Sequence, residues 1–354
     1  MKENDKNEMI SEPDENGVRY YTSSQMPPGA GRKRLKKPLL IFGGIILAVI
    51  LLGVACDQME SRSSTGQFAD IKDDHISILY IDGTIGADDT DSIYGSGTYS
   101  QKWTLDRLDD AIHNPNNKGL ILSINTPGGS VYETDEVYLK LKEYKKTGRP
   151  LYAAMGSMAA SGGYYLSAPA DKIVANRNCW TGSIGVTIGT VFDVSGFLEK
   201  NGIKTVTITS GKNKAMGSIV DPLTKEQKAI YQSLVDEAYE QFVGVVAQGR
   251  KMPVAQVKKL ADGRIYTAKQ ALQNGLVDQV GTLDDAVSDM KKQYRLWDCE
   301  VYDMKYEHSS LLGSLFGKLS GAGKSRDMGD VAALLEIMND QGRAPITYMS
   351  EIRK

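Results

Sequence analysis

The stretch Met155-Gly-Ser-Met-Ala-Ala-Ser-Gly-Gly-Tyr-Tyr165 sets the architecture expected for this chain. Small residues at this density let backbones approach closely, and glycines permit the positive φ angles of a sharp turn between a strand and a helix. A serine at such a turn has an exposed hydroxyl beside unpaired N–H groups. Ser161 is therefore the first candidate for a catalytic nucleophile. On this stretch alone, a packing turn in which the serine caps a helix is an equally good reading.

Composition narrows the classes of function. The chain has 354 residues, enough for two domains and a large core, and its net charge of −2 indicates no attraction to nucleic acid. No C-x-x-C pair, no H-E-x-x-H motif and no histidine pair at metal spacing occurs among Cys56, Cys179, Cys299, His75, His113 and His308. We therefore expect no disulfide framework, no metal site and no cofactor.

An uncharged apolar run, Leu39–Cys56, approaches the roughly 20 residues that a membrane-spanning helix needs. Basic residues precede it and acidic residues follow it, so the positive-inside rule places the N-terminus in the cytoplasm and the rest of the chain outside. A cleaved signal peptide and a buried core helix are the alternatives. Gly53-Val-Ala-Cys56 also resembles a lipoprotein processing site, which leaves lipidation of Cys56 open.

The remaining regions follow from polarity and periodicity. We expect a disordered cytoplasmic tail, a transmembrane helix, a linker, a folded domain and a flexible tail over residues 1–37, 38–56, 57–74, 75–306 and 307–354, respectively.

Within the folded domain, strand-like and helix-like segments alternate. Strands are expected over 75–81, 120–124, 150–155, 172–175 and 205–209, and helices over 104–113 (capped by Thr104), 132–146, 196–202 and 224–248. This alternation predicts an α/β fold in which helices flank a parallel sheet. The turns Pro127–Gly129 and Ala160–Gly163 both follow strands, so we expect them side by side at one end of the sheet, where such folds bind ligands.

A serine nucleophile needs a base. His113, at the end of a helix, would permit a Ser-His-Asp triad, but the histidines are poorly distributed for this role. A lysine can replace histidine if it is neutral. The reference pKa of lysine is about 10.4, so a lysine that is neutral near pH 7 needs its pKa lowered by about 3 units, which corresponds to roughly 4 kcal/mol. Burial of the amine in an apolar pocket can lower the pKa by this amount. The candidates are Lys212 and Lys214, although either alone fits a solvated surface charge.

Several motifs together resemble the bacterial signal peptide peptidase A family, with the blocks in family order from about residue 76 to 290. They are Asn125-Thr-Pro-Gly-Gly-Ser130, Met158-Ala-Ala-Ser-Gly-Gly-Tyr-Tyr165, Thr181-Gly-Ser-Ile-Gly-Val186, Gly211-x-x-Lys214 and Asp262-Gly-Arg-x-Tyr266 followed by Gly275-Leu-Val-Asp278. The resemblance implies a ClpP/crotonase-like fold and a membrane-bound Ser-Lys protease in its half-length form.

Carried over residue by residue, the resemblance makes Ser161 the nucleophile and Lys214 the general base. Ser183 matches the serine that orients the lysine amine. The N–H of Gly162 matches one oxyanion donor, and either Gly128 or Gly129 supplies the other. One departure is Gly217-Ser-Ile-Val-Asp-Pro222, where the family usually continues toward Ser-Pro.

The resemblance implies an endopeptidase that hydrolyses apolar peptides, such as cleaved signal peptides, in or at the cytoplasmic membrane. It also implies homo-oligomers in which neighbouring subunits share each active site. Two alternatives keep the same fold: a crotonase-like acyl-CoA enzyme, and a non-catalytic membrane scaffold. An extracytoplasmic domain disfavours the first, because CoA is absent there.

Overall fold

The structure is a computed structural model that describes residues 68–69, 71–87, 98–306 and 347–349. All of them belong to one compact unit, Ser61–Lys354. The expected tail at 1–37, the expected membrane span at 38–56 and Cys56 lie outside the described residues. Within the described part, no helix is both long and apolar enough to cross a membrane.

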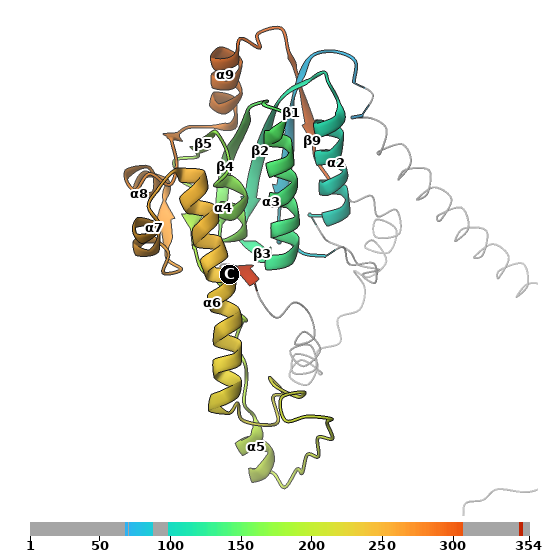
Figure 1. The fold of residues 1–354 in the computed structure, drawn as a ribbon, viewed down its shortest axis with the longest axis vertical. Coiled ribbons are helices and arrows are strands. Elements are labelled where there is room, and N and C mark those ends of the chain that lie inside the picture. Colours follow the sequence, from blue (N-terminus) through green and yellow to red (C-terminus); the bar gives the residue numbers. More distant parts are fainter. Residues whose placement is uncertain (1–67, 70, 88–97, 307–346, 350–354) are drawn as a thin grey trace, which may run out of the picture. The chain divides into compact units, whose positions relative to one another are not determined.

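Eight of the described strands form one sheet with the order β7-β6-β4-β2-β1-β9, and β5 joins β4 to β8 (Figure 1). Their bounds are β1 His75–Asp82, β2 Asn117–Thr126, β4 Leu151–Ala160, β5 Lys172–Ala175, β6 Trp180–Gly182, β7 Ile265–Thr267, β8 Gln279–Val280 and β9 Glu300–Met304. All pairings in this sheet are parallel except that of β6 with β7. The expected parallel α/β architecture is confirmed.

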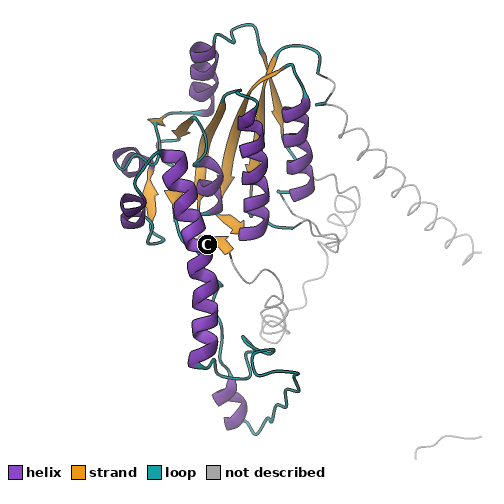
Figure 2. Ribbon diagram, in the orientation of Figure 1, coloured by secondary structure: helices purple, strands orange, loops and turns teal. Residues whose placement is uncertain are grey.

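Helices cover both faces of the sheet (Figure 2). Their bounds are α2 Gln101–His113, α3 Val131–Lys146, α4 Gly162–Ser167, α5 Ser195–Lys200, α6 Lys225–Arg250, α7 Val254–Leu260, α8 Ala268–Gln273 and α9 Leu283–Tyr294. One core cluster joins the sheet to α2, α3, α4 and α6, and a second cluster joins the opposite face to α9. The central strands are therefore apolar on both faces, as is typical of parallel sheets.

The sheet branches at strand β4, because the two halves of this strand pair with different neighbours. Its first half, Tyr152–Met155, pairs with β5, whereas Met158–Ala160 pairs with β6. The register with β2 also shifts between Ile124 and Thr126. The sheet therefore opens around the end of β4, and the backbone beyond Ala160 emerges between β2 and β6.

Helix α6 is buried only near its C-terminal end. Phe242, Val243, Val245 and Val246 pack into the core, whereas Leu234, in the preceding half, is 42% exposed. The long apolar stripe expected from the sequence therefore meets the core only at its end. The N-terminal half carries the segment 187–224, which includes α5, away from the sheet (Figure 1). We call this segment the arm.

Two local expectations are corrected, and one strand forms where no strand was predicted. Helix α2 begins at Gln101, because the hydroxyl of Ser100, not that of Thr104, accepts from the N–H of Trp103. The alternating segment 205–209 is not a strand: no partner strand is described beside it. Within the expected flexible tail, Thr347–Met349 forms a further strand, β10, which pairs with Gly128–Ser130 (β3).

Candidate active site

Ser161 lies at a sharp turn between β4 and α4. Its φ of 55° and ψ of −116° place a non-glycine residue in a strained conformation, which structures tolerate mainly at functional sites. Its backbone is fixed on both sides, because the Ser161 N–H donates to the Gly182 carbonyl at 2.7 Å and its carbonyl accepts from Tyr165 N–H at 2.9 Å. The expected strand–turn–helix placement of this serine is confirmed.

The small residues after Ser161 permit a close approach of two backbone segments. A Cβ on Gly162 would lie 3.2 Å from Gly128 Cα and 3.4 Å from Gly129 N, and a Cβ on Gly163 would lie 2.7 Å from Thr126 Cγ2. The two glycine-rich turns therefore touch, as the sequence predicts. Only glycine at position 162 leaves this contact unstrained.

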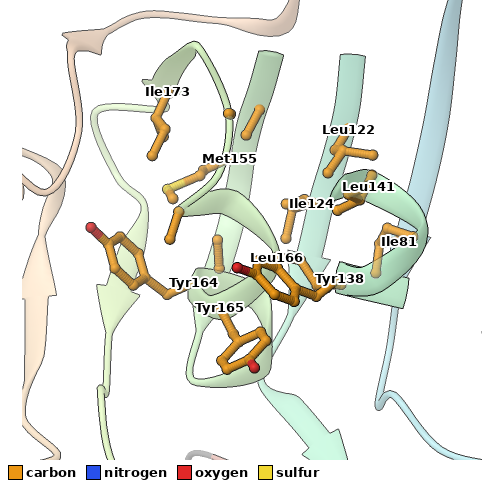
Figure 3. Packing of buried hydrophobic residues seen from close by; sticks show 14 of the residues in the cluster. Ile81, Leu122, Ile124, Tyr138, Leu141, Met155, Tyr164, Tyr165, Leu166 and Ile173 are labelled. Carbon is orange, nitrogen blue, oxygen red and sulfur yellow. The ribbon is translucent and has the colours of Figure 1, made fainter. Parts of the chain in front are cut away.

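The aromatic pair anchors α4 in the core. Tyr164 donates its hydroxyl to the Leu276 carbonyl at 2.8 Å, and Tyr165 donates to Asp135 Oδ1 at 2.6 Å. The Tyr165 ring also packs edge-on against Phe242 of α6, at 5.0 Å between centroids. Figure 3 shows the two tyrosine rings pointing to different sides of α4. The turn that carries Ser161 is thus held rigidly by the helix that follows it.

The Gly-Gly turn continues into β3, which runs beside Ile85. The Ile85 N–H donates to the Gly128 carbonyl, and the Ser130 N–H donates to the Ile85 carbonyl, both at 2.9 Å. The Gly128 N–H donates to Thr126 Oγ1 at 3.0 Å. Gly129 has no room for a side chain, because a Cβ there would lie 1.8 Å from the Ile85 carbonyl oxygen.

Ser183 lies next to Ser161 through the pairing of β4 with β6. Ala160 is paired with Gly182, so the residues that follow them, Ser161 and Ser183, leave the two strands together. Ser183 also has a positive φ, 50°, and its N–H donates to the Arg264 carbonyl at 2.8 Å. The structure therefore brings Ser161, Gly162, Ser183 and the Gly-Gly turn together at one edge of the sheet.

Lys214 is not at this edge in the same chain. It lies in the arm, where Tyr231 of α6 donates to the Met216 carbonyl at 3.0 Å and the neighbouring Lys212 forms an ion pair with Glu226 at 2.8 Å. Helix α6 rises roughly 24 Å, at about 1.5 Å per residue, from Glu226 to Phe242, whose ring packs against Tyr165 of α4. Lys214 is exposed to solvent and lies in the arm, at the far end of this stretch of α6. One chain alone therefore does not bring Ser161 and Lys214 into contact.

Neither described histidine can serve Ser161. His75 begins β1 and His113 ends α2 shortly before β2 begins, whereas Ser161 follows the carboxyl end of β4. Because these strands are parallel, both histidines lie toward the opposite edge of the sheet. His308 lies outside the described residues. A triad built on His113 is therefore ruled out within the chain.

Cys179, just before β6, is not a competing nucleophile. It is fully buried, and burial raises the pKa of its thiol to about 12, so that almost no thiolate exists at neutral pH.

Two threonines of the site were not predicted from the sequence. Thr126 orients the Gly-Gly turn through the bond to the Gly128 N–H, a turn in which a threonine hydroxyl accepts from the amide two residues later. Its place directly before Pro127-Gly128 is the signal that could have revealed it. Thr134 of α3 is fully buried and lies 3.0 Å from the position of a Cβ on Gly162, and nothing in the sequence pattern marks it.

Comparison with known proteins supplies the family. Residues 143–296 match the model of peptidase family S49. A protein of Enterococcus faecium assigned as a signal peptide peptidase SppA is 39% identical over 239 residues, which cover 68% of this chain and 69% of the relative. This chain belongs to peptidase family S49, the family of signal peptide peptidase A.

Further relatives of this S49 peptidase carry protease names. A protein of Methanocaldococcus jannaschii assigned as a protease is 32% identical over 86% of this chain and 98% of its own length. Protease 4 of Haemophilus influenzae is 35% identical over 60% of this chain but only 34% of its own length. The chain is therefore a serine peptidase, and the S49 match, from α3 to the end of α9, includes Ser161, Ser183 and Lys214.

Proposed function

We propose that this S49 peptidase cleaves peptide bonds with Ser161 as its nucleophile. The observation that carries the proposal is the strained turn at Ser161 beside the amide of Gly129. A strained, well-anchored turn holds the hydroxyl in one orientation, so little entropy is lost when it attacks a carbonyl carbon. The attack gives a tetrahedral intermediate, then an acyl-enzyme and a free amine, and water then releases the acid.

The amides of Gly162 and Gly129 are the proposed oxyanion donors. Gly162 is the first residue of α4, and the first N–H groups of a helix have no acceptor within it. Of the two glycines in the turn, Gly128 already donates to Thr126, which leaves Gly129 as the better candidate. Amides fixed in this way stabilise the charge that develops on the carbonyl oxygen.

The proposed base is Lys214 of a neighbouring copy of the chain. The separation of about 24 Å along α6 argues against a base from the same chain. The arm also exposes large apolar side chains: Phe197 is 66% exposed, Val206 85% and Ile208 93%. Exposed apolar groups gathered in one segment mark an interaction surface. If a second copy covers the arm, it also buries the lysine, and burial favours the neutral amine that a base requires.

Ser183 is the proposed positioning residue for that amine. It leaves β6 beside Ser161, is only 8% exposed, and is held at a positive φ. A hydroxyl fixed there can accept a hydrogen bond from an incoming lysine and direct its lone pair toward Ser161.

We further propose that residues 38–56 anchor the enzyme in the cytoplasmic membrane, with the catalytic domain outside the cytoplasm. Apolar peptides such as signal peptide remnants are then its substrates, since they reside in the same bilayer. A nucleophile turn at the branching point of β4 also supports a ClpP/crotonase-like fold.

A fluorophosphonate probe tests the nucleophile and the base. We expect it to label the wild type at Ser161, to leave Ser161→Ala unlabelled, and to label Lys214→Ala far more slowly, because the base is missing. Lys212→Ala is the matched control, since its exposed ion pair with Glu226 is worth little and its loss should leave labelling unchanged. Undiminished labelling of Ser161→Ala would refute the proposal.

A further inference from the structure

The hydroxyl of Thr134 is a buried polar group next to the proposed oxyanion site. Thr134 lies near the start of α3 and is fully buried. It shares a face of that helix with Tyr138, four residues later. Figure 3 shows Tyr138 beside Tyr165 of α4, and the two rings lie 5.2 Å apart between centroids. This face of α3 therefore packs on the helix that begins with Gly162.

The Thr134 hydroxyl lies close to both of the amides proposed as oxyanion donors. A Cβ on Gly162 would lie 3.0 Å from Thr134 Oγ1 and 3.4 Å from the Gly129 nitrogen. The other proposed donor is the amide of Gly162 itself. The hydroxyl is thus a near neighbour of both amides, although no hydrogen bond joins it to either of them.

Thr104 of α2 shows the usual bond of a buried threonine at this helical position. Each of the two threonines lies four residues after the N-cap serine of its helix, Ser100 in α2 and Ser130 in α3. Thr104 is also buried, and its hydroxyl donates to the Ser100 carbonyl at 2.7 Å. The Thr134 hydroxyl does not make the corresponding bond and has no hydrogen-bond partner among the described residues. It is directed toward Gly162 instead.

An unpaired buried hydroxyl does not stabilise the fold, so its presence needs another explanation. Replacing such a group by an apolar group of the same shape is nearly neutral or stabilising. Groups that lower stability are tolerated where activity needs them. A hydroxyl that has no bond in the resting enzyme can rotate toward a charge that forms later, because no bond has to break. The charge that forms beside Gly162 and Gly129 is the oxyanion.

We propose that Thr134 supports the oxyanion site from within the core. As Ser161 attacks, the hydroxyl turns its O–H toward the negative charge that forms at the amides of Gly162 and Gly129. In the protein interior this attraction is screened less than in water. The neutral carbonyl of the bound substrate attracts the O–H more weakly, so the interaction raises kcat and leaves KM nearly unchanged. Thr134 itself does not touch the substrate, and the inference rests on the proposed function of the site.

Steady-state hydrolysis of an apolar fluorogenic peptide tests this role. We expect Thr134→Val, which keeps the shape of the side chain, to lower kcat by about tenfold with KM unchanged, a smaller loss than removal of a direct oxyanion donor causes. A peptide aldehyde forms an adduct with Ser161 that places an oxygen at the oxyanion site, and its affinity should fall by a similar factor. Thr134→Ser keeps the hydroxyl and loses only the methyl group, so it should recover most of the kcat.

Thr104→Val is the matched control, because it removes a buried hydroxyl at the same position of α2. That hydroxyl is bonded to the Ser100 carbonyl, so this variant should lose unfolding free energy in urea and keep its kcat. Thr134→Val should do the reverse and lose kcat without losing stability. With a purely structural role of Thr134, kcat would follow stability in both variants.

Two results would overturn the inference while the proposed function stands, provided that hydrolysis depends on Ser161. One is a Thr134→Val enzyme with the kcat and the aldehyde affinity of the wild type. The other is a Thr134→Ser enzyme as slow as Thr134→Val, since the hydroxyl would then not be the group that matters. If hydrolysis survives Ser161→Ala, the proposed function fails and the inference fails with it.

Discussion

Gly162→Ala tests the geometry of the proposed oxyanion site with a single methyl group. The new Cβ would lie 3.0 Å from Thr134 Oγ1, 3.2 Å from Gly128 Cα and 3.4 Å from Gly129 N. Carbon contacts are normally about 3.5–4.0 Å, so the Gly-Gly turn must move by a few tenths of an ångström. This movement displaces the Gly129 amide from the reacting carbonyl.

We expect Gly162→Ala to lower kcat strongly and to lower the unfolding free energy only slightly. Removal of one oxyanion donor typically lowers kcat by about 10²–10³, or 2.7–4 kcal/mol, and we expect a fall of about 10² with little change in KM. Overpacking costs about 1–3 kcal/mol of unfolding free energy, and alanine in a helix offsets up to about 1 kcal/mol of that cost.

The assay is hydrolysis of an apolar fluorogenic peptide, with urea unfolding of the same preparations. Gly244→Ala is the control, because Gly244 lies in α6 and, outside the backbone of that helix, no atom of the described residues comes within 4 Å of the position that its new methyl group would take. This variant should keep its kcat and gain up to about 1 kcal/mol of stability. A folded Gly162→Ala enzyme with the kcat of the wild type would refute the assignment of the oxyanion site.

Three further outcomes are expected. Thr134→Val should raise the unfolding free energy in urea by about 1 kcal/mol, because the buried Thr134 hydroxyl has no hydrogen-bond partner among the described residues; a loss of stability would mean that the hydroxyl is bonded. Cys179 should resist alkylation at pH 8 until the protein is unfolded, since burial raises its pKa to about 12; peptide mass spectrometry before and after urea measures this. Burial, opposed by a bond to the Asp73 carbonyl, lowers the pKa of His75 below 6.5, so the unfolded chain binds the proton first. Unfolding free energy should therefore fall as the pH drops below about 6.5, by at most about 1.4 kcal/mol per pH unit, and His75→Gln should remove this slope in urea titrations from pH 8 to 5.

The sequence predicts the parts of the site that depend on local backbone chemistry. Ser161 and its glycines require a sharp turn after a strand, and parallel strands bring such turns to one edge of a sheet. The contact between Gly162 and the Gly128-Gly129 turn follows from these two facts. The choice between Gly128 and Gly129 does not, because it depends on whether the Thr126 hydroxyl takes one of the amides.

The position of Lys214 depends on long-range packing, which periodicity does not reveal. The alternation at 205–209 indicates a strand, but a strand needs a partner, and Val206 and Ile208 remain exposed in one chain. The same applies to α6, whose apolar stripe begins well before Phe242, the first residue of the helix that is buried in the core. Strand β10 is equally hidden, since three residues carry no periodicity and their pairing with β3 is set by the tertiary fold.

A mixing experiment tests the central claim, that each active site combines Ser161 of one copy with Lys214 of another. Ser161→Ala and Lys214→Ala chains, each with its own tag, are expressed together and purified through both tags. Each variant alone should be inactive on the fluorogenic peptide. If neighbours pair at random in a closed assembly, about one quarter of the sites in the mixture carry both intact residues. The account predicts activity near that fraction of the wild type. Mixed assemblies that contain both chains and remain inactive would contradict it.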